Sequence, residues 1–189
     1  MADPLFKFGH VPDSENSAPF EYPNCWAHER TIRVNRLVIA PRGHHVPLMI
    51  DLLESMKEPY GLLYVLVVPR TEQCGGRYQS PESVSRESAK TFLLQFQNFL
   101  EQDGRHHLWV GAVDKSSLLV YDRHNVLYAY GPLPAFEETL RAKGLREAQQ
   151  IRFPSPHSHH YHDSFDVELD ALMKHLAWKQ SPLVDGDEL

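Results

Sequence analysis

The chain has 189 residues, of which 42% are hydrophobic and 23% are charged. This composition is that of an ordinary globular protein and excludes wholesale disorder; a chain of this length suits one domain that buries roughly 70% of the surface its unfolded form exposes. The formal net charge at pH 7 is -6, and lysines and arginines are scattered along the chain. Without a concentrated basic face, we expect no binding to nucleic acid.

The longest apolar run, GLLYVLVVP at 61–69, is too short to span a bilayer, which needs roughly 18 apolar residues. We therefore expect no membrane span and interpret this run as a buried strand. The first twenty residues lack the basic and then apolar pattern of a secretory signal. A cytoplasmic location follows as an expectation, with Cys25 and Cys74 as reduced thiols.

The chain divides into an N-terminal arm at 1–30, one domain at 31–180 and an acidic tail at 181–189. The prolines of the arm interrupt long elements, so we expect it to be irregular. Its large aromatic residues predict that it packs on the domain; they are Phe6, Phe8, Phe20, Tyr22 and Trp26. The tail is expected to be disordered.

The first half of the domain predicts a strand, a helix and a second strand. Residues 31–40 alternate and then become continuously apolar, residues 46–57 place apolar side chains at helical spacing, and residues 61–68 form the buried run. A helix of this length is typical of a crossover between parallel strands. A second long helix is expected from the cap Ser80 to the stop Gly104.

Three antiparallel strands are expected next, at 106–113 and within 117–131. Asp122 to Asn125 fits a short hairpin turn, in which Asn125 can take the left-handed conformation. Because both faces of this hairpin carry apolar residues, we predict that it lies at the centre of the sheet.

A short helix at 134–144, a strand at 147–153 and a last helix from about Asp163 complete the pattern. Together the segments predict an α+β single domain. We expect a mixed sheet of about six strands, opening with a βαβ crossover and continuing as an antiparallel meander, packed by about four helices.

The segment PSPHSHHYHDSFD holds four of the twelve histidines, His157, His159, His160 and His162. In an extended segment His157 and His159 point to one side, and His160 and His162 point to the other. Because a zinc site needs three or four converging ligands, we expect a polar loop that folds without metal and binds one only weakly. The alternative is a transition-metal site, such as a zinc site, formed by His157, His159 and His162.

The spacing of His157, His159 and His162 is similar to the H-x-H-x-D-H motif of the metallo-β-lactamase-like hydrolases. The match covers six residues, and Tyr161 stands where that motif has the aspartate of its second metal. We therefore transfer no function from it and predict no cofactor.

Two loops offer a different candidate site. The strands at 31–40 and 61–68 are each followed by Pro-Arg, and parallel strands would bring Arg42 and Arg70 to the same sheet edge. With His44 and Arg77 in the same loops, these residues form a candidate pocket for a carboxylate or phosphate.

No catalytic motif is recognisable: the chain lacks a G-x-S-x-G elbow, an S-x-x-K pair and a Walker loop. This favours a non-enzymatic binding domain, with a protein partner as its ligand. The alternatives are an anion or small-molecule binding protein or enzyme that uses Arg42 and Arg70, and a metal-binding protein that uses the segment from His157 to His162.

Overall fold

The computed structural model describes residues 5–13, 16–32, 34–70 and 72–187. Its strands are β1 (Phe8–Asp13), β2 (Asn16–Pro19), β3 (Cys25–Arg30), β4 (Asn35–Ala40), β5 (Tyr60–Leu66), β6 (Gly76–Gln79), β7 (His106–Ala112), β8 (Leu118–Tyr121), β9 (Leu127–Tyr130), β10 (Arg146–Glu147), β11 (His157–His159) and β12 (Lys179–Ser181). Its helices are α1 (His45–Leu53), α2 (Arg86–Gln95), α3 (Gln97–Gln102), α4 (Leu133–Ala142) and α5 (Asp166–His175), and a 3-10 turn (Asp163–Phe165) precedes α5.

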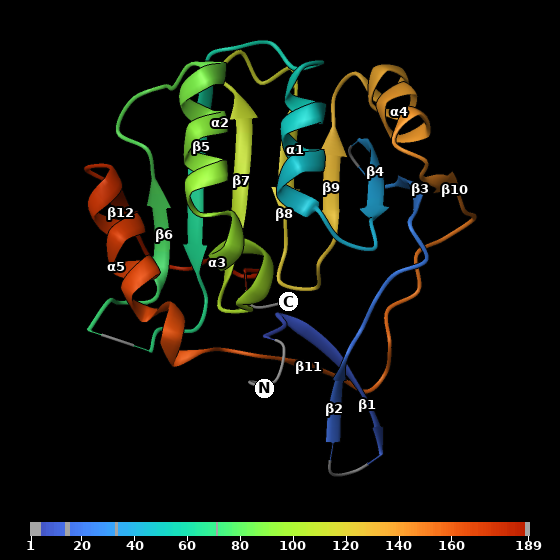
Figure 1. Ribbon diagram of the computed structural model, residues 1–189. Helices are drawn as coiled ribbons and strands as arrows, with labels where there is room; N and C mark the ends of the chain where they lie inside the picture. The colour runs from blue at the N-terminus through green and yellow to red at the C-terminus, as the bar shows by residue number, and fades with distance from the viewer. Residues whose placement is uncertain (1–4, 14–15, 33, 71, 188–189) are drawn as a thin grey trace.

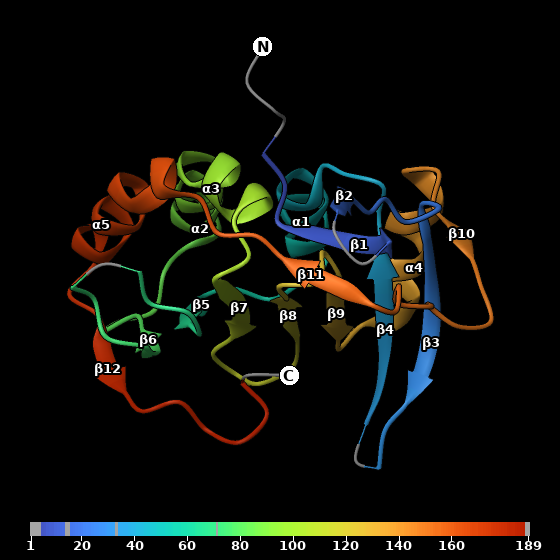
Figure 2. The same cartoon turned by 90° about the horizontal axis from the view of Figure 1, so that it is seen from below.

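The α+β class is confirmed, but the count of about six strands is too low. Within the described residues, nine strands form one sheet in the order β10-β3-β4-β9-β8-β7-β5-β6-β12, and β11-β1-β2 form a second sheet. The five α-helices lie on one face of the large sheet (Figure 1), and the small sheet lies beside one end of it (Figure 2). No helix in the described part of the chain is long and apolar enough to cross a membrane.

The predicted crossover joins strands that are not neighbours. β4 and β5 run in the same direction, because four successive antiparallel pairings link them through β9, β8 and β7. The predicted meander is confirmed as β7, β8 and β9, and it fills the space between the two ends of the crossover. Its hairpin is central, with Asn125 at a φ of 60°.

The helix expected from Ser80 begins later and is divided. Val84 first pairs with Tyr60 of β5, and only then does Ser85 accept a hydrogen bond from the backbone N–H of Ser88 at 3.2 Å to cap α2. Phe96 leaves helical geometry, with a φ of -103° and a ψ of 11°, and separates α2 from α3. Pairing with the sheet therefore takes precedence over local helix propensity at 80–84.

The N-terminal arm is more regular than expected, because residues 8–13, 16–19 and 25–30 are strands. Its aromatic residues pack as expected: Phe8 and Tyr22 join Val38 and Val126 in a buried cluster between the two sheets. An irregular arm was expected because prolines interrupt it, but long-range pairing with β4 and β11 provides the hydrogen bonds that the local sequence does not suggest.

The chain after α4 also differs from the expectation. The strand expected at 147–153 is reduced to the two residues of β10. In the tail at 181–189, which we expected to be disordered, Ser181 is the last residue of β12 and Asp187 is only 6% exposed. The Asp187 carboxylate accepts a hydrogen bond from Arg77 at 3.4 Å, and its backbone carbonyl accepts one from Nε2 of His107 at 3.0 Å.

The main core lies between the helices and the large sheet, and Leu119 of β8 is fully buried at its centre. We expect Leu119→Ala to lower the free energy of unfolding by about 2 to 4 kcal/mol, because buried area is lost and a cavity remains. Urea titration measures the change. The substitution Leu118→Ala on the same strand, at a partly exposed position, is the control; equal costs at the two positions would show that β8 is not central to the core.

Lys7 is fully buried, and its Nζ donates a hydrogen bond to the Leu100 carbonyl at 3.1 Å and lies 3.8 Å from the Tyr121 ring centroid. Burial lowers its pKa to about 7, although nearby carboxylates, chiefly that of Asp122, raise it.

The unfolded chain holds this proton up to the ordinary pKa of 10.5, so the free energy of unfolding should rise with pH between about 7 and 10.5. We expect Lys7→Met to raise Tm most at or below pH 7 and progressively less as the pH approaches 10. Melting of both proteins across this range tests the prediction, and a difference in Tm that does not change with pH would contradict it.

Candidate metal centre

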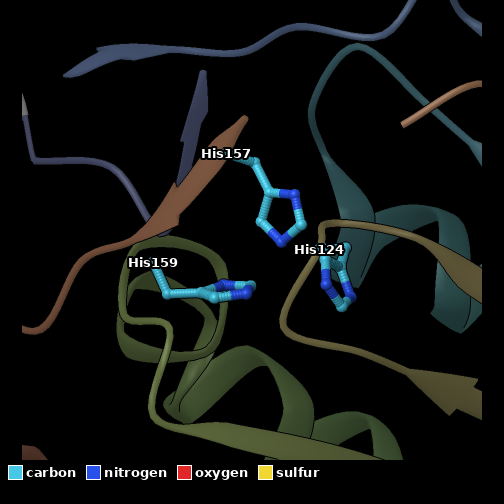
Figure 3. Close-up of side chains that lie close together, drawn as sticks. All are labelled: His124, His157 and His159. Carbon is cyan, nitrogen blue, oxygen red and sulfur yellow. The ribbon is translucent and has the colours of Figure 1, made fainter. Parts of the chain in front are cut away.

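Three imidazoles converge at the end of the large sheet nearest the small sheet. His124 comes from the turn between β8 and β9, and His157 and His159 come from β11 (Figure 3). One ring nitrogen of each residue lies within 4.8 Å of the other two. The ring centroids are 4.8 to 5.5 Å apart. The sequence separates the turn from β11 by more than thirty residues, so only the fold assembles this cluster.

Alternation along β11 directs the histidines, as expected for an extended segment. β11 pairs antiparallel with β1, with His159 opposite Phe8 and His157 opposite His10. His157 and His159 therefore share one side of the strand. On the other side, Ser158 lies 3.0 Å from Nε2 of His160.

The Asp122 carboxylate fixes the turn that carries His124. One oxygen accepts hydrogen bonds from the backbone N–H groups of His124 and Val126 at 2.9 and 3.0 Å, and the other lies 3.0 Å from Nδ1 of His124. Burial raises the pKa of Asp122, but the hydrogen bonds from His124 and Val126 outweigh it and hold the pKa below its ordinary value. The carboxylate is therefore ionised and can only accept.

These partners leave metal-binding nitrogens available. Nδ1 of His124 must donate to Asp122, and Nδ1 of His157 donates to the Pro154 carbonyl at 3.1 Å, so the tautomer of each ring that binds a metal has its lone pair on Nε2. A carboxylate bonded to the second nitrogen of a ligand histidine is the usual outer support of a zinc site.

His159 is the most enclosed of the three. Its Nδ1 is buried and has no hydrogen-bond partner among the described residues. Burial, and then the positive charge of Arg123, lowers its pKa to about 3. The ring is therefore neutral at physiological pH, which is the form that binds a metal.

Phe8 forms an apolar wall to the cluster, with its ring centroid 5.3, 5.4 and 5.5 Å from those of His124, His157 and His159. Phe153 lies 5.5 Å from His124. His157 is exposed, so the cluster is covered on the Phe8 side and remains accessible through His157.

Three imidazoles suit zinc and other late transition metals. Tetrahedral ligand nitrogens about 2.0 to 2.1 Å from zinc lie about 3.3 Å apart, so the three rings, whose nitrogens lie within 4.8 Å of one another, must move closer together to bind an ion. Three protein ligands leave a fourth position for water or a substrate, which is the arrangement of catalytic rather than structural zinc.

The third residue of the metal set expected from sequence lies elsewhere. Nε2 of His162 is 3.1 Å from the Phe6 carbonyl, and its backbone N–H donates to Asp103 at 2.9 Å. Its ring is stacked with that of His160, with centroids 6.5 Å apart. Sequence reasoning missed His124. The available signal was its position after Asp122 in a hairpin turn, a setting in which a carboxylate two residues earlier can orient an imidazole.

The four residues expected to bind an anion are not brought together. Arg42 and His44 line a cavity of about 750 Å³ beside α1. Arg70 forms ion pairs with Asp163 and Asp166 beside α5, and Arg77 pairs with Asp187. β4 and β5 end at the same edge of the sheet, but three strands lie between them.

We compared the chain with protein-family models, with curated proteins and with solved structures. No family model, curated protein or solved structure matches it. The histidine cluster is therefore the feature of this chain from which a function can be inferred.

Proposed function

We propose that this protein binds a transition metal of the zinc type through His124, His157 and His159. The observation that carries the proposal is the convergence of three imidazole nitrogens within 4.8 Å of one another. The carboxylate of Asp122 and the carbonyl of Pro154 support it, because they direct a free lone pair from two of the rings. With an open fourth position, the bound ion would act as a Lewis acid toward a small ligand.

Elemental analysis of untagged protein, purified without a metal-affinity resin, tests the proposal. We expect about one equivalent of zinc or a related metal after dialysis, and a lower Tm after a chelator removes it. Because the main core packs without the cluster, the metal-free protein should remain folded. Metal-free protein whose Tm does not respond to added zinc, cobalt or nickel would contradict the proposal.

A second candidate function is anion binding in the cavity beside Arg42 and His44. Lys143 and Arg146 also line it. Asp51 lies 2.6 Å from Lys143 and Glu21 lies 3.9 Å from Arg42, so the charge of Arg146 remains in excess. Thermal shift with a panel of carboxylates and phosphates tests it. Arg42→Gln should reduce the rise in Tm that the anions cause, and Arg70→Gln should not. Equal rises in the wild type and in both variants would exclude this cavity as the anion site.

A further inference from the structure

Arg123, the residue before His124, is a buried cation without an acidic partner among the described residues. It is 8% exposed. Its Nη2 donates to the Tyr161 hydroxyl at 3.0 Å, and its Nε is buried without a hydrogen-bond partner in the described part of the chain. Arginine is almost never buried unpaired, and leaving such a charge uncompensated is costly. Arg123 is therefore a candidate for binding a ligand.

Arg123 is joined to the histidine cluster through the residues around it. Its guanidinium is hydrogen-bonded to Tyr161, which lies two residues after His159, just as His157 lies two residues before His159. The His159 ring also forms a hydrogen bond with the backbone of Arg123. A ligand on a metal at the cluster would thus lie close to this arginine.

The charges around the cluster do not balance once a metal is bound. A bound dication and Arg123 would both be positively charged. Among the described residues, the carboxylate that contacts a cluster residue is that of Asp122. Excess positive charge in an enclosed site is stabilised by an anionic ligand.

We infer that the open metal position binds an oxyanion, the carboxylate or phosphate group of a small molecule, with one oxygen on the metal and another accepting hydrogen bonds from Arg123. The inference rests on the proposed metal site. A planar guanidinium matches a carboxylate or phosphate with two parallel N–H donors, whereas a neutral ligand would leave it unpaired. The Tyr161 hydroxyl accepts from Arg123, so its own proton is free to donate to the same anion.

Cobalt substitution provides the test, because the visible absorption of bound Co²⁺ reports on its ligands. Metal-free protein is titrated with Co²⁺, and the loaded protein is then titrated with inorganic phosphate and, separately, acetate. We expect saturable changes in the cobalt bands with at least one anion. In Arg123→Gln we expect cobalt binding to persist and the anion affinity to fall about tenfold or more, the usual effect of losing a charged hydrogen bond.

Two further variants complete the design. Arg141→Gln removes an exposed arginine on α4 and should leave the anion affinity unchanged. Tyr161→Phe removes the hydroxyl that holds Arg123 and should weaken the anion; it carries the test if Arg123→Gln does not fold.

The outcomes separate the two proposals. If Co²⁺ does not bind to the wild type, the metal site itself is refuted. If Co²⁺ binds but neither anion changes its bands, the oxyanion inference is overturned and the metal site stands. The inference is also overturned if Arg123→Gln, or Tyr161→Phe in its place, binds the anion as tightly as the wild type.

Discussion

Replacement of His124 by alanine is expected to lower the affinity for zinc by more than about a hundredfold. Even an outer partner of a ligand histidine is worth about 10 to 100-fold in metal affinity, and in the proposed site His124 would itself supply one of the three ligand nitrogens. Competition with a chromophoric chelator measures the dissociation constant. Circular dichroism should show an unchanged fold, because His124 lies in a turn outside the main core.

His162→Ala is the matched control, because it removes a histidine of the same segment whose Nε2 lies against the Phe6 carbonyl. We expect it to keep the zinc affinity of the wild type. The reverse result, with zinc lost in His162→Ala and kept in His124→Ala, would show that the ligands are His157, His159 and His162, the set that spacing alone suggests.

The second large effect concerns the buried ion pair beneath the histidine segment. Arg105 and Asp103 are both fully buried, and Arg105 donates to both oxygens of Asp103 at 2.7 and 3.0 Å. Its remaining nitrogen donates to Asp166 at 2.7 Å, at the start of α5. We expect Asp103→Ala to lower the free energy of unfolding by about 3 to 5 kcal/mol, because the buried Arg105 charge loses its principal partner.

Urea titration of Asp103→Ala measures this loss. Glu147→Ala removes an exposed carboxylate that lies 3.8 Å from Arg141, and a surface pair of this kind should change the free energy of unfolding by less than about 1 kcal/mol. If Asp103→Ala lowered the free energy of unfolding by an equally small amount, water would be screening the Arg105–Asp103 pair, and the pair would not anchor the end of the histidine segment.

The central hairpin and the helices could be predicted because their signals are local. Leu119 and Tyr121 alternate with less buried neighbours, and Asn125 takes the left-handed conformation that the turn requires. The edge strands could not be predicted in this way. β10 and β12 have two and three residues and depend on pairing with β3 and β6, which no local pattern encodes.

Only part of the candidate metal site could be predicted from the sequence. Alternation brings His157 and His159 to the same side, as the structure has them, but it cannot say which distant residue completes the set. That depends on β11 pairing with β1 and on β1 lying beside the turn of His124, two long-range contacts. Arg42 and Arg70 illustrate the same limit, because parallel direction was inferred correctly and adjacency was not.

Zinc-edge anomalous diffraction from crystals soaked with zinc is the most direct test of the metal site. We predict one strong anomalous peak within about 2.0 to 2.1 Å of a ring nitrogen of each of His124, His157 and His159, with a non-protein oxygen as a further ligand. A peak between His160 and His162, or no ordered peak at the three converging rings when zinc is in excess, would contradict the account.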